Sequence, residues 1–160
     1  MSYLKWLEES LSGKLDAKPI GEPVALRAYL ELSSDHGHLV PTAAAAAAIA
    51  GRWFGAGLPT VYAQGGPGQG YVSITARYPG GQTALIVAEA RRGDTTEPPA
   101  ARLLLIGNKG TIEFADSPGS DMRPIDFSPP SGPAEGALGD AISSSLRSGS
   151  PVVPQGGARG

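Results

Sequence analysis

The sequence contains no cysteine, so it can form neither a disulfide framework nor a zinc–thiolate site, and it has no thiol nucleophile. A chain of this kind fits a reducing compartment. No stretch stays apolar for the ~20 residues that a membrane-spanning helix needs. The N-terminal segment MSYLKWLEESLSGK also lacks the apolar core of a signal peptide. We therefore expect a soluble, cytoplasmic protein without a membrane span.

Clusters of basic residues are also missing. The longest run of Lys or Arg is Arg91-Arg92, and the formal net charge of the chain is −2. Proteins that bind nucleic acid or anionic lipid usually gather Lys and Arg along one face. The sequence therefore argues against both kinds of partner.

The residues that are present are typical of one globular domain. The 160 residues are 41% hydrophobic and 18% charged, with 23 glycines and 15 prolines. A chain of this length can bury one core without metal or disulfide support. We expect a single domain over residues 1–153, followed by a flexible tail at 154–160.

The first segment with a helical pattern lies near the N-terminus. We expect a helix over residues 3–12, which Ser2 can cap and Gly13 ends. The spacing i, i+3, i+7 predicts that one face of this helix packs on the core. The residues of that face are Leu4, Leu7 and Leu11.

Two further helices are expected. An alanine run follows Thr42 and continues to Phe54, and alanine has the highest intrinsic helix propensity. Its small side chains favour close packing on a sheet. The last helix is expected near residues 133–148, with one apolar stripe formed by Leu138, Ala141, Ile142 and Leu146.

Strands account for most of the remaining pattern. Residues 24–32 alternate with period two, which predicts a half-buried strand. One face of it has Val24, Leu26, Ala28, Leu30 and Leu32, and the other has Ala25, Arg27, Tyr29 and Glu31. Further strands are expected at 59–64, 70–78, 82–91, 101–107, 111–115 and 121–127. Short Gly/Pro turns separate most of them, which favours an antiparallel meander.

The pair of strands at 70–78 and 82–91 has two different faces. One face is apolar and rich in small residues: Val72, Ile74, Ala76, Tyr78, Ala84, Ile86, Ala88 and Ala90. The other mixes apolar and charged residues: Tyr71, Thr75, Arg77, Leu85, Val87, Glu89 and Arg91. We interpret the mixed face as a candidate interface, with an ordinary amphipathic solvent face as the alternative.

Two motifs suggest ligand binding, but the residues around them do not support that role. The segment AQGGPGQGY is rich in glycine, but a strand pattern follows it where a dinucleotide loop needs a helix. The tripeptide Arg92-Gly93-Asp94 lies in a hydrophilic loop, and we assign it no adhesion role. Neither a P-loop nor a nucleophile elbow is present, so an active site formed by this chain alone has little support.

The two histidines of the chain stand together in Asp35-His36-Gly37-His38. An imidazole can transfer protons near neutral pH, and a neighbouring carboxylate can orient it. His38 and Asp35 are therefore the candidate catalytic residues. A metal site is a second interpretation, although no third ligand is evident and we predict no metal. The remaining alternative is a polar loop that leads into the alanine helix.

Five segments resemble one enzyme family when they are taken in order. They are IGEPVALRAYLEL, GLPTVYAQGG, YVSITARYPGGQTALIVAEAR, ARLLLIGNKGTIEFAD and GDAISSSLRSGSPV. Together they resemble the C-terminal domain of the Gfo/Idh/MocA oxidoreductases over residues 14–153. The hairpin around GNKG is similar to the GtkGsl hairpin of that domain.

The resemblance implies an α+β fold with a large, mainly antiparallel sheet, helices packed on one face, and an open face for subunit contacts. In that family the nicotinamide cofactor belongs to an N-terminal Rossmann domain, which this sequence does not contain. The family commonly has HxxD near the start of the helix. His38 is the best match to its histidine, and Pro41 stands at the position of the acid.

Two functions are consistent with these observations. The first is a non-catalytic binding or assembly subunit, without a cofactor, that associates with a protein partner or another copy through the open sheet face. The second is the substrate-binding chain of a split NAD(P)-dependent oxidoreductase, which acts on a sugar or polyol with a separate Rossmann partner. A third possibility is that the sequence is a piece of a longer enzyme.

Overall fold

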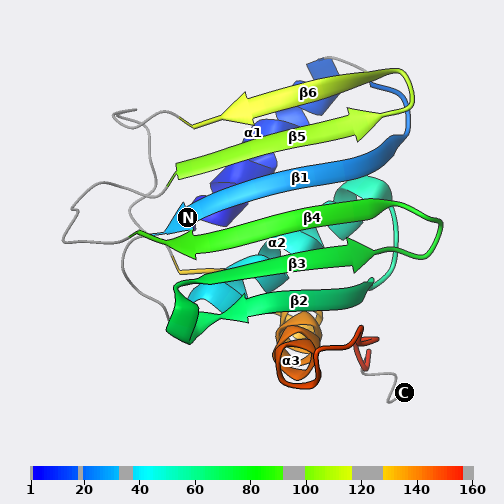
Figure 1. Ribbon diagram of the computed structural model, residues 1–160. Helices are drawn as coiled ribbons and strands as arrows, with labels where there is room; N and C mark the ends of the chain where they lie inside the picture. Colours follow the sequence, from blue (N-terminus) through cyan, green and yellow to red (C-terminus); the bar gives the residue numbers. More distant parts are fainter. Residues whose placement is uncertain (1, 18–19, 33–37, 92–99, 117–127, 157–160) are drawn as a thin grey trace.

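The computed structural model describes residues 2–17, 20–32, 38–91, 100–116 and 128–156 (Figure 1). The predicted strand at 121–127, the Arg-Gly-Asp segment and the candidate Asp35 lie outside these residues. The helices are α1 (Tyr3–Ala17), α2 (Leu39–Phe54) and α3 (Pro133–Ser148), with a short 3₁₀ turn, η2, at Pro67–Gln69. The strands are β1 (Pro23–Leu32), β2 (Thr60–Gly66), β3 (Tyr71–Arg77), β4 (Thr83–Ala90), β5 (Ala100–Gly107) and β6 (Gly110–Ala115).

The strands form one six-stranded sheet in the order β2-β3-β4-β1-β5-β6 (Figure 1). All neighbours are antiparallel except β1 and β4, which run parallel. The predicted α+β class with a mainly antiparallel sheet is confirmed. The simple meander was wrong at one step, because β1 lies between β4 and β5. The connection from Ala90 to Ala100 is longer than the ~2–5 residues of a hairpin turn, so it can cross to the far side of β1.

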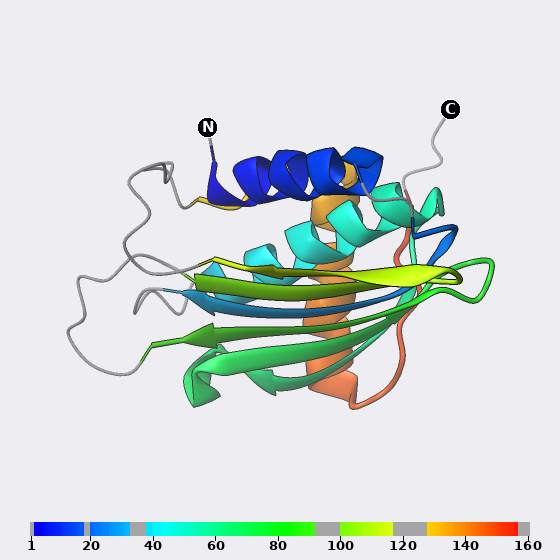
Figure 2. The ribbon, with the colours of Figure 1, turned by 90° about the horizontal axis from the view of Figure 1, so that it is seen from above.

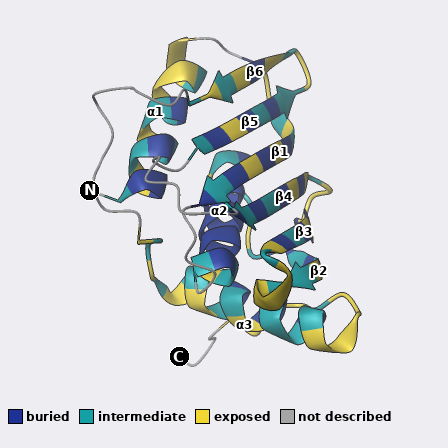
Figure 3. Cartoon of the chain, turned by 60° about the vertical axis from the view of Figure 1, so that its left-hand side comes forward, coloured by how far each residue is buried: buried dark blue, intermediate teal, exposed yellow. Residues whose placement is uncertain are grey.

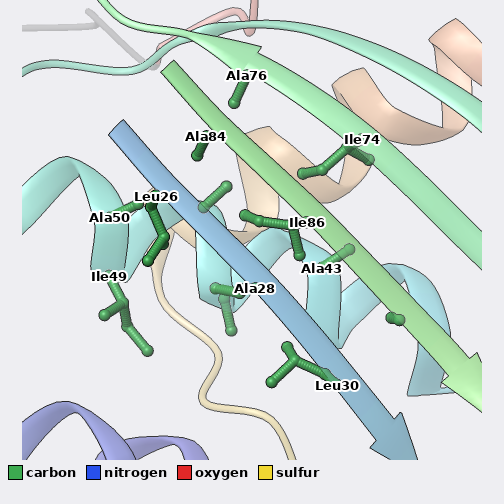
Figure 4. Close-up of a cluster of buried hydrophobic side chains, with 14 of the residues drawn as sticks. Leu26, Ala28, Leu30, Ala43, Ile49, Ala50, Ile74, Ala76, Ala84 and Ile86 are labelled. Atoms are coloured by element: carbon green, nitrogen blue, oxygen red, sulfur yellow. The ribbon is translucent and has the colours of Figure 1, made fainter. Parts of the chain in front are cut away.

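The helices and the sheet form two layers (Figure 2). Both α1 and α2 lie on one face of the sheet, while α3 packs against α2 and the edge strand β2. Figure 4 shows side chains of β1, β3 and β4 pointing toward the alanines of α2. All eight residues predicted for the apolar face of β3 and β4 are at most 3% exposed. Alanine on both layers allows this close packing.

Helix α1 is longer than predicted. It continues through Gly13 to Ala17, so the expected end at Gly13 was wrong. Gly13 does not have the positive φ of a helix-terminating glycine. Leu15 packs against the core in the next turn, which offsets the low helix propensity of glycine. The predicted packing face is confirmed, since Leu4, Leu7 and Leu11 are buried.

Strand β1 departs from its predicted pattern at its start. Val24 was expected on the buried face, but 42% of its surface is exposed. The pairing of β1 with β5 shifts register between Pro23 and Ala25, and such an irregularity turns the local side chain away from the regular alternation. From Leu26 to Leu32 the predicted alternation is confirmed.

The segment after α3 packs against the sheet edge. Val152 forms an antiparallel bridge with Val61 in β2, with hydrogen bonds of 2.9 and 2.8 Å. Pro154 is buried. The last four residues, 157–160, lie outside the description, so the flexible tail stays a prediction.

Candidate interaction surface

We use the name open face for the sheet surface opposite α1 and α2. In the part of the chain that the structure describes, no helix covers this surface (Figure 2). Exposed and buried residues alternate along the strands because successive side chains point to opposite faces (Figure 3). The open face is therefore a direct consequence of the alternating sequence pattern.

Cross-strand pairing arranges the open face in rows that run across all six strands. One row consists of Tyr62, Thr75, Leu85, Arg27, Leu104 and Glu113. The next consists of Gln64, Ser73, Val87, Tyr29, Arg102 and Ala115. Apolar residues thus occupy the middle of the sheet, with arginines beside them.

The seven residues predicted for the mixed face lie together on the open face. Tyr71, Thr75, Arg77 and Leu85 are exposed, whereas Val87, Glu89 and Arg91 are partly buried. Their placement agrees with the predicted alternation. A role in subunit contacts stays a prediction, because the structure contains one chain.

A shallow depression of about 430 Å³ lies across β4, β1, β5 and β6. Its open-face side chains are Arg27, Tyr29, Leu85, Val87, Arg102, Leu104, Glu113 and Ala115. Only Leu85 and Val87 among them were predicted as interface residues from the sequence; Arg27, Tyr29, Arg102, Leu104, Glu113 and Ala115 were not. The run LLLI hides the alternation of β5, and only Arg102 marks which residues face outward.

Hydrogen bonds hold the charged groups at one end of the open face. The Tyr29 hydroxyl donates a 2.5 Å bond to Oε2 of Glu89 across the parallel pair of β1 and β4. This hydrogen bond, followed by burial and by the charges of Glu89 and Glu31, raises the pKa of Tyr29 to about 12. Arg91 holds Glu31, with a distance of 2.8 Å from Nε to Oε1. The carboxylate of Glu89 is therefore hydrogen-bonded to Tyr29, and that of Glu31 is paired with Arg91.

Other charges of the open face have no such partner. Among the described residues, Arg27, Arg77 and Arg102 form no ion pair, and neither does Glu113. Arg27 and Arg102 lie on the neighbouring strands β1 and β5 in adjacent rows, so they are diagonal neighbours. The depression therefore has an apolar floor with two uncompensated guanidinium groups.

Comparisons with known proteins find the same fold in several solved structures. No protein-family model and no curated protein matches the sequence. A "probable dehydrogenase" from Thermotoga maritima has a similar structure, with a TM-score of 0.66, 15% identity, and coverage of 93% of this chain and 61% of that one. The myo-inositol 2-dehydrogenase of Lactobacillus plantarum has a TM-score of 0.59 and 12% identity, and the match covers 97% of this chain and 62% of that one. The myo-inositol dehydrogenase of Lactobacillus casei, solved with NAD(H) and myo-inositol, has a TM-score of 0.56 and 13% identity, and the match covers 88% of this chain and 55% of that one.

The chain has the fold of the C-terminal domain of Gfo/Idh/MocA-type dehydrogenases. The fold predicted from the five sequence segments is thus confirmed. The chain spans less than two thirds of the length of the matched enzymes. At these identities the likeness establishes the fold and leaves activity open.

The candidate catalytic residues lie apart from the open face. His38 occupies the position before the first residue of α2, where its side chain makes no capping hydrogen bond. Because α2 belongs to the helix layer, His38 is separated from the depression by the sheet. Asp35 is outside the described residues, so the structure does not test its pairing with His38.

The described part of the chain has neither a metal-binding cluster nor a membrane-spanning helix. Among the described residues, no group of three or more His, Cys, Asp or Glu side chains is arranged to hold a metal ion. The described helices also include none that is long and apolar enough to cross a membrane.

Proposed function

We propose that this protein is a non-catalytic binding or assembly subunit that associates with a protein partner or another copy through its open face. One observation carries the proposal. The large apolar residues Tyr29, Tyr71 and Leu85 are 38%, 38% and 43% exposed, and all three lie on one uncovered sheet face. Contiguous exposed apolar surface of this kind marks sites of protein association.

The open face is large enough for a specific interface. Six strands spaced about 4.8 Å apart, each presenting roughly 20 Å of its length, give a projected area of about 500 Å². Side-chain relief increases the accessible area toward the ~800 Å² per partner of a standard interface. A mixed rim around an apolar centre also matches the anatomy of known interfaces.

The test is a mass measurement in solution with variants of the apolar centre. We expect the purified protein, alone or with its partner, to form a complex in analytical ultracentrifugation. Leu85→Glu and Val87→Glu should each weaken this complex by at least about 100-fold, because an unpaired charge in an interface costs about 3–5 kcal/mol.

Val153→Glu is the matched control for these variants. Val153 is 69% exposed and lies in the C-terminal segment beyond the sheet, so the same change should leave the complex intact. Circular dichroism of each variant establishes that the fold is unchanged. A monomer that binds no protein under any condition contradicts the proposed function.

The proposal includes the absence of a cofactor in this chain. NAD(P) would enter only through a separate Rossmann partner, as in the family that the sequence resembles. We expect no heat of binding when the isolated chain is titrated with NAD(H) in a calorimeter. Saturable binding at a defined stoichiometry would contradict this part of the proposal.

A second candidate function is the substrate-binding chain of a split oxidoreductase that acts on a sugar or polyol. It is favoured by the structural likeness to inositol dehydrogenases over 55–62% of their length. In this case His38 would be an acid/base residue, together with Asp35. Mixing the chain with a separate nucleotide-binding chain should then give NAD(P)-dependent activity that His38→Ala abolishes. Activity that survives this substitution excludes the role of His38.

A further inference from the structure

A cavity of about 440 Å³ lies at the end of the sheet where β1 and β4 begin (Figure 1). It is lined by residues 22–24 at the start of β1, by residues 80–82 in the turn between β3 and β4, and by Phe54, the last residue of α2. None of these residues lines the depression of the open face. His38 stands at the other end of α2, about 24 Å away at 1.5 Å per residue. The cavity is therefore separate from both candidate sites described above.

Two acceptor groups in this cavity have no partner within the described part of the chain. The carboxylate of Glu22 forms no ion pair there, and no Lys or Arg side chain lines the cavity. The side-chain oxygen Oε1 of Gln82 is buried and accepts no hydrogen bond. Buried carbonyl oxygens of folded proteins nearly always have a donor, so Gln82 provides an unused acceptor at this site.

The amide of Gln82 can present this oxygen to the cavity. The amide lies against Gly80, where an added Cβ would be 3.0 Å from Oε1 and 3.4 Å from Nε2. Gly80 has a φ of +105° and no side chain, so the turn leaves room for the amide. A 180° turn about the last bond of the side chain exchanges the amide oxygen and nitrogen. Because neither atom has a partner in the described chain, the exchange breaks no hydrogen bond.

Much of the remaining cavity wall is apolar. Val24 is 42% exposed, because the register shift between Pro23 and Ala25 turns it out of the buried row. Irregularities of this kind are over-represented next to active sites. Phe54 contributes an aromatic ring, which packs edge-on against Tyr78 with 5.0 Å between the ring centroids. An apolar wall with a few polar groups is the usual composition of a small-ligand site.

We propose that this cavity binds a small organic ammonium ion, which is an alkylamine in its protonated form. The N–H groups of the ligand donate to the carboxylate of Glu22 and to the amide oxygen of Gln82, and its alkyl chain lies against Val24. Glu22 repels an anion, and a neutral alcohol leaves this carboxylate without a counter-charge. The proposal goes beyond the function proposed for the open face and does not depend on it.

The first experiment is an NMR titration of the full chain with three probes of matched size: n-butylammonium, butanol and butyrate. We expect butylammonium to shift the signals of the Val24 methyls, the Gly80 amide and the Gln82 side chain. This shift should saturate with a Kd of about 1 mM, which is within the ceiling for so small a ligand. Butanol and butyrate should give no saturable shift. Butylammonium that fails to saturate these signals, or butanol that binds equally well, overturns the proposal.

Two variants separate ligand binding from a structural role. Glu22→Gln should weaken butylammonium binding by about three- to tenfold, because water weakens the ion pair of an exposed carboxylate. Gln82→Leu should also weaken binding. Since it removes a buried acceptor that has no donor, its urea midpoint of unfolding should be equal to or above that of the wild type.

Glu113→Gln is the matched control, because Glu113 is an exposed carboxylate of β6 that does not line the cavity. Butylammonium binding should be unchanged in this variant. Binding that stays unchanged in Glu22→Gln overturns the proposal. A lower urea midpoint in Gln82→Leu, together with intact binding, shows that the amide has a structural role and overturns it as well.

A last titration distinguishes the two sources of an ammonium group. Acetyl-lysine methylamide has the side chain of a lysine in a protein, whereas butylammonium represents a free amine. Tighter binding of butylammonium assigns the cavity to a free amine, and tighter binding of the lysine derivative assigns it to a lysine side chain of another protein. Either result supports the ammonium chemistry, and the absence of saturable binding for both overturns it.

Discussion

The hydroxyl of Ser145 in α3 accepts a 2.9 Å hydrogen bond from the backbone N–H of Ala63 in β2. The same hydroxyl donates a 2.7 Å bond to the carbonyl oxygen of Ser150. Together with the bridge between Val61 and Val152, these bonds satisfy backbone groups on the outer edge of β2. Unsatisfied edges promote pairing between chains, so α3 and the segment after it protect this end of the sheet.

Replacing Ser145 with Ala should destabilise the protein. The change leaves the N–H of Ala63 without its acceptor in a buried place, which costs about 1–3 kcal/mol. Urea denaturation monitored by circular dichroism gives the free energy of unfolding. The control is Ser143→Ala on the same helix, where we expect a change of less than about 0.5 kcal/mol. Equal stability of the two variants would contradict the role of Ser145.

Gly13→Ala should stabilise the protein by about 0.5–1 kcal/mol. Gly13 lies inside α1, and a Cβ at this position meets no atom within 4 Å. Gly55→Ala is the informative comparison, because Gly55 ends α2 with a φ of +61° and an L-residue is strained there. The same chemical change should therefore have opposite signs at the two sites. Thermal unfolding of both variants provides the measurement.

Arg52 links all three helices. Its Nε lies 2.6 Å from a carboxylate oxygen of Glu8 in α1, and its Nη1 lies 3.5 Å from one of Glu135 in α3. Because the arginine side chain is 48% exposed, water and salt weaken these pairs. Arg52→Ala should lower the free energy of unfolding by at most about 1 kcal/mol. The difference from wild type should shrink in 1 M NaCl, and an unchanged difference would indicate lost packing instead.

Stability should fall at alkaline pH because of two tyrosines. Burial raises the pKa of Tyr78, whose hydroxyl donates a 2.6 Å bond to the carbonyl oxygen of Ala47. The pKa of Tyr29 is raised to about 12 by its bond to Glu89. The folded chain therefore holds these protons more tightly than the unfolded chain, where tyrosine titrates near pH ~10. The stabilisation is complete below about pH 10 and is lost as the pH rises through the folded-state values.

Urea denaturation between pH 8 and 11.5 measures this dependence. We expect the slope of stability against pH above 10 to become smaller in Tyr78→Phe and Tyr29→Phe. A titration of tyrosinate absorbance in the folded protein gives an independent check. If all five tyrosines ionise together near pH 10 while the chain stays folded, the prediction is wrong.

Local patterns in the sequence determined much of this structure. The alternation over residues 71–91 separated the buried face from the open face, because successive side chains of a strand point to opposite sides. The alanine run predicted a helix that packs closely on the sheet, since small side chains allow a short separation. The order of five segments also identified the fold. All of these are properties of neighbouring residues or of chain order.

Only the tertiary structure decided which strands are neighbours. The insertion of β1 between β4 and β5 depends on pairing between distant segments, and sequence spacing contains no record of it. That insertion places Arg27 beside Arg102 and Leu85, and it joins Tyr29 to Glu89. The register shift at Val24 and the continuation of α1 past Gly13 are also set by contacts with distant parts of the chain. Packing against the rest of the chain outweighs local preference at these sites, so the charge pattern of the open face is a tertiary property.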